Sequence, residues 1–111
     1  MPTAGSPGNM DEQDRVADFV ATHDLDAPPA YRLLDAASEL GELAKEVNES
    51  TDYGSDPDAV DIAPDELGDT LFALLALADA ADIDAETALE TALEKYERRL
   101  DETDTAASGE L

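Results

Sequence analysis

The sequence contains no cysteine and no tryptophan, and it has only six lysine and arginine residues against 29 aspartate and glutamate residues. Without cysteine, disulfide bonds and thiolate metal ligands are excluded. With a net charge of −23, the chain lacks the basic surface that nucleic acids and anionic membranes require, so neither is an expected partner. There is no secretory signal pattern and no apolar run of the roughly 18 residues that span a bilayer. We therefore expect a cytoplasmic protein.

The acidic residues are spread along the whole chain, and only two of the six basic residues are lysine. This distribution is typical of the surface of a halophilic protein rather than of an acidic tail. Most of the carboxylates are therefore expected to be solvated surface groups.

The apolar pattern predicts an all-α fold, a four-helix bundle that forms a single domain over residues 11–102. No stretch alternates in the manner of a strand. The polar ends, residues 1–10 and 103–111, are expected to be disordered tails. The four helices are predicted at about residues 11–23, 29–50, 64–81 and 85–102. A polar connection of residues 50–63, punctuated by glycine and proline, is long enough to be a mobile flap.

The helix at 64–81 is expected to be the centre of the bundle, because Asp79 is the only charge between residues 70 and 81. Its leucine arc is expected to be buried, and its alanine stripe is expected to allow another helix to approach closely. The arc comprises Leu67, Leu71, Leu74, Leu75 and Ala78, and the stripe comprises Ala73, Ala76 and Ala80. Such an apolar helix exceeds what a small monomer can cover, which predicts a homodimer or a dimer of dimers.

Two similar segments carry the candidate site, ELGE at residues 39–42 and ELGD at residues 66–69. Residues three apart lie about 5 to 6 Å apart on one helix face, so each segment offers a carboxylate pair that can share a cation. Both segments hold a glycine inside a helical pattern, which costs about 1 kcal/mol and suggests a packing or functional reason. The alternative is a solvated acidic face, especially on helix 29–50, where Ala37, Leu40, Ala44 and Val47 form the expected buried arc.

Half of the positive charge lies close together on the last helix, at Lys95, Arg98 and Arg99. Both arginines have an acid three or four residues away on their own helix, whereas Lys95 has none and shares a face with Arg99. Two cations on one face suit a bound polyphosphate. A salt bridge to another helix is the alternative.

Taken together, Glu39-x-x-Glu42, Glu66-x-x-Asp69 and Lys95-x-x-x-Arg99 resemble the MazG-like nucleoside triphosphate pyrophosphohydrolases over about residues 30–100. The resemblance implies an all-α oligomer that hydrolyses nucleoside triphosphates to monophosphate and pyrophosphate. It also implies Mg²⁺, with Mn²⁺ as a substitute, held by the four carboxylates, one of which activates water, while Lys95 and Arg99 bind the phosphates.

The chain departs from the common family pattern at Ser38, Asp79 and Glu94. Two further functions stay open. One is phosphoribosyl-nucleotide pyrophosphohydrolysis within the same superfamily, and the other is a non-catalytic acidic helical module for dimerisation or partner binding.

Overall fold

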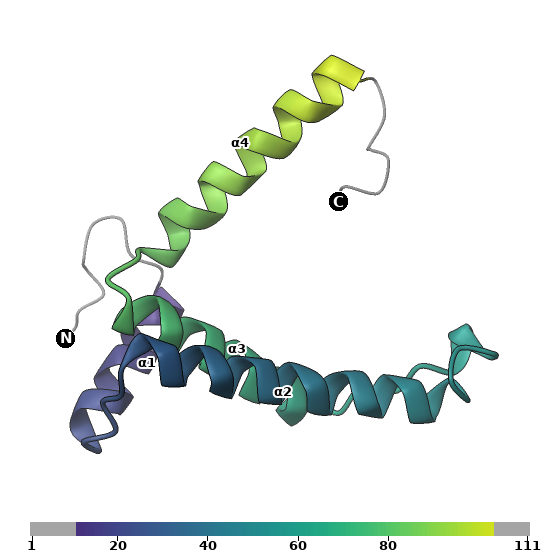
Figure 1. Ribbon diagram of the computed structural model, residues 1–111, viewed down its shortest axis with the longest axis horizontal. Helices are drawn as coiled ribbons and strands as arrows, with labels where there is room; N and C mark the ends of the chain where they lie inside the picture. The colour runs from purple at the N-terminus through teal and green to yellow at the C-terminus, as the bar shows by residue number, and fades with distance from the viewer. Residues whose placement is uncertain (1–10, 104–111) are drawn as a thin grey trace.

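The computed structural model describes residues 11–103, which form four α-helices and no strand (Figure 1). The helices are α1 (Asp11–Thr22), α2 (Pro29–Ser50), α3 (Pro64–Ala80) and α4 (Ala85–Thr103), and a short 3-10 helix, η1 (Pro57–Ala59), lies in the connection between α2 and α3. The all-α, four-helix prediction is confirmed, with each boundary within a residue of the expected one. The tails predicted at 1–10 and 103–111 lie outside the described residues, apart from Thr103, which ends α4.

Local signals explain where the helices begin. Pro29 and Pro64 occupy the first turns of α2 and α3, where a residue without an amide hydrogen is tolerated. Asp84 caps α4 as expected: its Oδ1 accepts a hydrogen bond from the Glu86 amide at 3.2 Å, and its Oδ2 accepts one from the Thr87 hydroxyl at 2.8 Å.

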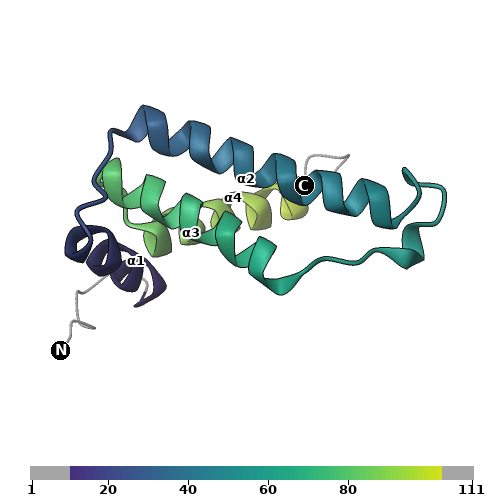
Figure 2. The same ribbon diagram turned by 90° about the horizontal axis from the view of Figure 1, so that it is seen from below.

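The helices α2 and α3 run antiparallel and side by side, and α1 packs against α3 (Figures 1 and 2). Their contact is made largely by small side chains: Ala36 of α2 and Ala73 and Ala76 of α3 are buried. The alanine stripe of α3 is therefore a close-approach surface, as the sequence predicted. Val20 of α1 and Leu75 of α3 complete the small core.

The leucine arc expected in the core is buried only in part. Leu75 is 6% exposed, but the other three leucines of the arc are largely uncovered in this chain. Leu67, Leu71 and Leu74 of α3 are 54%, 49% and 50% exposed, and Leu40 of α2 is 57% exposed. Ala37 and Ala44, on the same flank of α2 as Leu40, are exposed as well. Both α2 and α3 have two stripes of small or apolar side chains. The smaller residues face the α2–α3 contact because they let the two backbones approach closely. The leucine stripes are left facing away from it.

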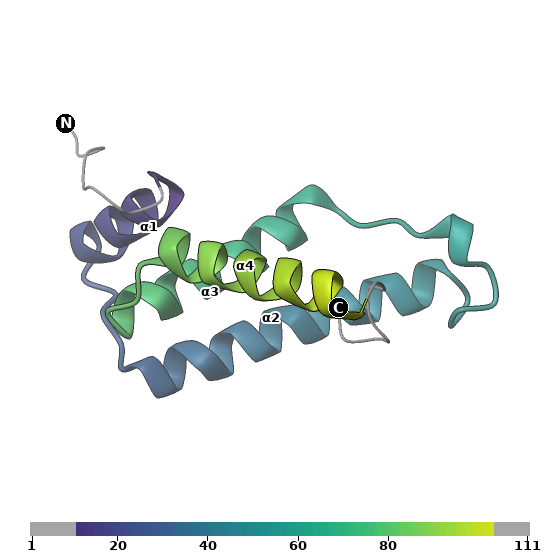
Figure 3. The same cartoon turned by 90° about the horizontal axis from the view of Figure 1, so that it is seen from above.

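Phe19 and the fourth helix also differ from expectation. Phe19, which its apolar character predicts to be a core residue, is 49% exposed. Its ring meets that of Phe72 edge to face, with 6.0 Å between the ring centres. The helix α4 leaves α3 at a tight turn and extends away from the other helices, so among residues 11–103 only α1, α2 and α3 pack together (Figure 1). In the view from above, α4 lies in front of α3 (Figure 3). Its Leu89 and Leu93 are each 51% exposed. Among residues 11–103, no helix is long and apolar enough to cross a membrane.

Candidate metal centre

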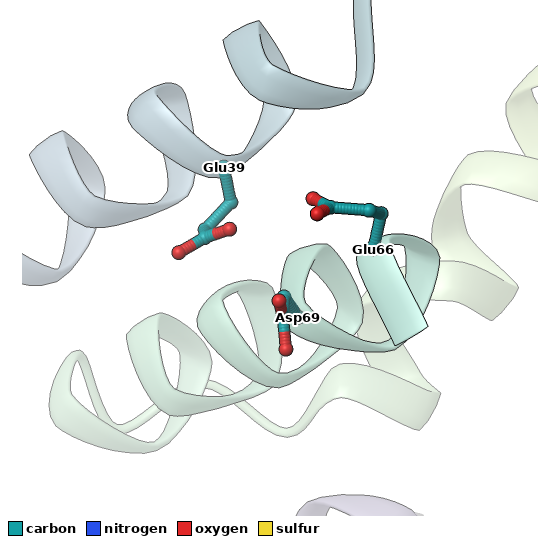
Figure 4. A group of neighbouring side chains, drawn as sticks. All are labelled: Glu39, Glu66 and Asp69. Carbon is teal, nitrogen blue, oxygen red and sulfur yellow. The ribbon is translucent and has the colours of Figure 1, made fainter. Parts of the chain in front are cut away.

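Three of the predicted carboxylates meet between α2 and α3. One oxygen from each of Glu39, Glu66 and Asp69 lies within 4.8 Å of the others. Figure 4 shows Glu39 reaching from α2 toward Glu66 and Asp69, which lie on successive turns of α3. The antiparallel pairing of α2 and α3 thus brings together acids from segments that are far apart in the sequence.

The surroundings of Glu66 disfavour its charge. Partial burial raises the pKa of its carboxyl above the ordinary value of 4.5, and the negative charges of Glu46, Asp65, Asp69 and Glu42 raise it further. Ionised Glu66 is therefore unfavourable in the protein alone, and a cation among these acids would relieve the repulsion.

The donor set fits a hard divalent cation. Oxygens bound to one Mg²⁺ at about 2.1 Å lie no more than about 4.2 Å apart, so small side-chain rotations would bring the three carboxylates into range. Mg²⁺ and Mn²⁺ prefer oxygen ligands, and this site supplies carboxylates alone. The half-burial of Glu39 and Glu66 and the exposure of Asp69 leave one side of the cluster open to a substrate.

Thr70 holds the two acid-bearing turns together. It is buried, and its hydroxyl lies 3.1 Å from the carbonyl oxygen of Glu66 and 3.4 Å from that of Glu39. The hydroxyl thus links the backbone of α3 to that of α2 directly beneath the acids. The spacing of acids in the sequence does not point to Thr70, although a threonine next to Asp69 in an otherwise apolar helix is a visible signal.

Glu46 is a second residue beside the site that the paired-acid motifs do not include. Its Oε1 accepts a hydrogen bond from the Ala63 amide at 3.1 Å, immediately before α3 begins. Its charge is also the strongest electrostatic contribution to the raised pKa of Glu66. The signal was its position seven residues after Glu39, on the same flank of α2. Glu46 therefore fixes the start of α3 while adding negative potential to the cluster.

Glu42 stands apart from the three-acid group. It is exposed on α2, one turn beyond Glu39, and its charge contributes to the raised pKa of Glu66. The structure thus brings together three of the four predicted ligands and leaves the fourth at the edge of the same negative region.

The predicted phosphate-binding residues lie on α4. Lys95 is exposed, and its ammonium lies 5.2 Å from the centre of the Tyr96 ring. Arg99 follows one turn later on the same helix face. Because α4 extends away from α2 and α3 (Figure 1), the two cations and the acid cluster are carried by separate parts of the chain.

The family model for the MazG nucleotide pyrophosphohydrolase domain matches residues 31–103. The structure is similar to the crystal structure of YpjD from Bacillus subtilis, which is named as a candidate pyrophosphatase, with a TM-score of 0.64 and 30% sequence identity. The match covers 85% of this chain and 96% of that one. No curated protein matches the chain at a significant level. The matched region contains α3, α4, the acid cluster and all of α2 except its first two residues, and the chain belongs to the MazG nucleotide pyrophosphohydrolase family.

Proposed function

We propose that this protein hydrolyses nucleoside triphosphates to nucleoside monophosphates and pyrophosphate, using Mg²⁺ held by Glu39, Glu66 and Asp69. The observation that carries the proposal is the carboxylate cluster, in which oxygens from α2 and α3 lie within 4.8 Å of one another inside the pyrophosphohydrolase domain. A cluster of acids at this spacing repels itself unless a cation is present, and a triphosphate needs the same cation to neutralise its charge.

The carboxylates and the two cations have separate proposed roles. Bound Mg²⁺ would supply positive charge to the triphosphate and lower the pKa of a water. Glu42 lies outside the group of three, yet its charge acts on Glu66, and we assign to it the role of accepting the proton of the attacking water. The water oxygen forms a bond to phosphorus as the α–β phosphoanhydride bond breaks, and pyrophosphate leaves with the electron pair of that bond. Lys95 and Arg99 would bind the phosphates.

We further propose that the protein works as a homodimer or a dimer of dimers. Leucine stripes on α2, α3 and α4 are about half exposed, including Leu40, Leu71 and Leu93. Rows of exposed leucines on helices favour burial against a partner, and a second copy offers matching leucine stripes. Assembly would cover these faces and give α4 packing that one chain does not provide.

The acid excess favours activity at high salt. A net charge of −23 on 111 residues destabilises the compact state through self-repulsion, and salt screens that repulsion. We therefore propose that molar salt is the working condition of the enzyme.

Product analysis tests the reaction. A nucleoside triphosphate is incubated with the protein and Mg²⁺ at molar salt, and the phosphorus products are followed by ³¹P NMR. The proposal requires equal amounts of monophosphate and pyrophosphate. Diphosphate with orthophosphate would place cleavage at the other anhydride bond and refute the proposal. Protein with Asp69→Asn is the control for a contaminating hydrolase.

A further inference from the structure

Gln13 of α1 makes both of its amide hydrogen bonds to the chain around the start of α4. It is 5% exposed. Its Nε2 donates to the carbonyl oxygen of Ile83 at 2.8 Å, and its Oε1 accepts from the amide of Ala85 at 2.8 Å. Ala85 is the first residue of α4, so one side chain from α1 binds both sides of the turn that joins α3 to α4.

This turn controls the direction of α4. It is short, and Asp82 adopts a left-handed conformation with φ 59°. Within residues 11–103, α4 makes at most marginal contact with the other helices of its own chain, so this turn is where its own chain holds it, whether or not a second copy also packs against its length. The two hydrogen bonds of Gln13 therefore act at the first residues of a 19-residue helix, where a small change in angle moves the far end most.

A small rotation of α4 about the turn produces a large displacement of the two cations, because they lie far along the helix. Lys95 and Arg99 lie ten and 14 residues beyond Ala85. At 1.5 Å per residue they are about 15 and 21 Å from the turn, so a 10° rotation would move Arg99 by about 4 Å. Hydrogen bonds from these cations to a phosphate need donor–acceptor distances of about 3 Å, so a displacement of that size would break them and weaken phosphate binding.

We propose that Gln13 is a positioning residue, which orients α4 through Ile83 and Ala85 and so places Lys95 and Arg99 for phosphate binding. The phosphate role of these cations rests on the proposed function, whereas the orientation of α4 does not. A primary amide suits the task because it supplies one donor and one acceptor in the order that the turn requires. Glutamate would lack the donor for Ile83, and methionine would lack both groups.

The protein should fold without this amide. A cavity of about 250 Å³ beside the turn is lined by Gln13, Ile83 and Asp84, so water can reach the carbonyl and amide that Gln13 leaves unpaired. Gln13→Met keeps the approximate volume of the side chain. It is therefore expected to loosen the turn and leave the α2–α3 contact intact.

The orientation of α4 can be measured directly, because the absence of cysteine allows clean labelling. Spin labels are attached at Asp35→Cys on α2 and Glu97→Cys on α4, both exposed, with labelled chains diluted in unlabelled protein. We expect Gln13→Met to broaden or shift the distance distribution, and Glu12→Gln on the exposed side of α1 to leave it unchanged. An unchanged distribution in Gln13→Met would overturn the proposal.

Kinetics supply the second readout. We expect Gln13→Met to raise the KM for nucleoside triphosphate about tenfold or more, since misplaced cations weaken phosphate binding. Mn²⁺ affinity at the carboxylates should be unchanged. In a Lys95→Ala, Arg99→Ala background, Gln13→Met should have no further effect. A loss of kcat alone, at constant KM, would indicate partial unfolding and count against positioning. If the wild-type protein hydrolyses no nucleotide, the proposed function fails and the label distances still decide the role of Gln13.

Discussion

The hydroxyl oxygen of Thr70 lies 3.4 Å from the main-chain carbonyl oxygen of Glu39, across the contact between α3 and α2. The same hydroxyl lies 3.1 Å from the carbonyl oxygen of Glu66, so one buried side chain joins the two turns that carry the carboxylate cluster. The separation of the acids thus depends on a neutral residue beneath them.

Thr70→Val removes this link while keeping the shape of the side chain. We expect a loss of about 1 kcal/mol in the free energy of unfolding, the usual value for one hydrogen bond. Metal affinity should fall by about tenfold or more, as it does when a supporting hydrogen bond behind a ligand is lost. Calorimetric titration with Mn²⁺ measures the affinity, and the exposed Thr91→Val is the matched control. Equal affinity in the two variants would show that Thr70 does not position the acids.

Asp69→Asn should abolish most activity while the helical fold is retained. Because Asp69 is inside the three-acid group, we expect a loss of at least about 100-fold in kcat/KM and a weaker metal affinity. Glu42→Gln should lower kcat with a smaller effect on metal affinity, since Glu42 lies outside that group. Asp101→Asn, at an exposed acid of α4, should behave as wild type. Full activity in Asp69→Asn would exclude the carboxylate cluster as the active site.

Glu66→Gln should raise stability in the metal-free protein at neutral pH. The raised pKa of Glu66 means that ionising it costs folding free energy. This cost is absent below the unfolded value of 4.5, and it grows as the pH rises through the higher folded value. Thermal unfolding of both proteins with EDTA should therefore give a gap in Tm at pH 7 that closes below about pH 4.5. A gap that persists in acid would mean that the charge is not its cause.

Metal affinity should depend on the same ionisation of Glu66, but it should increase as the pH rises. Glu66 must be deprotonated to hold a cation, so Mn²⁺ affinity should fall as the pH is lowered toward its raised pKa. Measuring the affinity from pH 7 to pH 5 checks this. An affinity independent of pH over that range would indicate ligands other than Glu66.

Leu71→Glu should shift the protein toward monomers. Leu71 is 49% exposed in one chain, and a carboxylate there would be unfavourable in an apolar interface between two copies. Sedimentation velocity at molar salt should show the wild-type protein as a dimer or larger and the variant as smaller. Leu25→Glu, in the connection before α2, serves as the control. A monomeric wild-type protein would contradict the proposed assembly.

Helix existence and boundaries could be predicted from the sequence because local signals determine them. Pro29, Pro64 and Asp84 each mark a helix start through backbone chemistry that needs no tertiary contact. The acid pairs were visible for a similar reason, since residues three apart share a helix face. Glu66 and Asp69 lie together as their spacing predicted, whereas Glu39 joins them across the α2–α3 contact and its own partner by spacing, Glu42, stays outside the group.

The pattern could not reveal which face of each helix is covered. Leu40 and Leu71 are apolar and periodic, yet smaller residues such as Ala36 and Ala73 make the contact because they allow closer approach. Nor does the chain itself explain Gly41 and Gly68, where an added Cβ would meet nothing within 4 Å. The packing reason inferred for these glycines is therefore not found within one chain.

The connection between α2 and α3 shows a further limit of sequence reasoning. Its polar composition predicted a flap, while the structure shows how its ends are held: the Asp61 amide donates to the Ser50 hydroxyl at 3.0 Å, and Ala63 donates to Glu46. Tyr53 in this connection is 76% exposed. Long-range pairs such as Glu46 with Ala63 depend on the assembled hairpin and leave no local signature.

Pyrophosphate release from a panel of nucleoside triphosphates at molar salt, with Mg²⁺ and then with EDTA, tests the central claim most directly. We predict release from at least one triphosphate with Mg²⁺, loss of that release with EDTA, and its recovery on adding excess Mg²⁺. Release that persists in EDTA, or no release from any triphosphate by folded protein, would contradict a metal-dependent nucleoside triphosphate pyrophosphohydrolase.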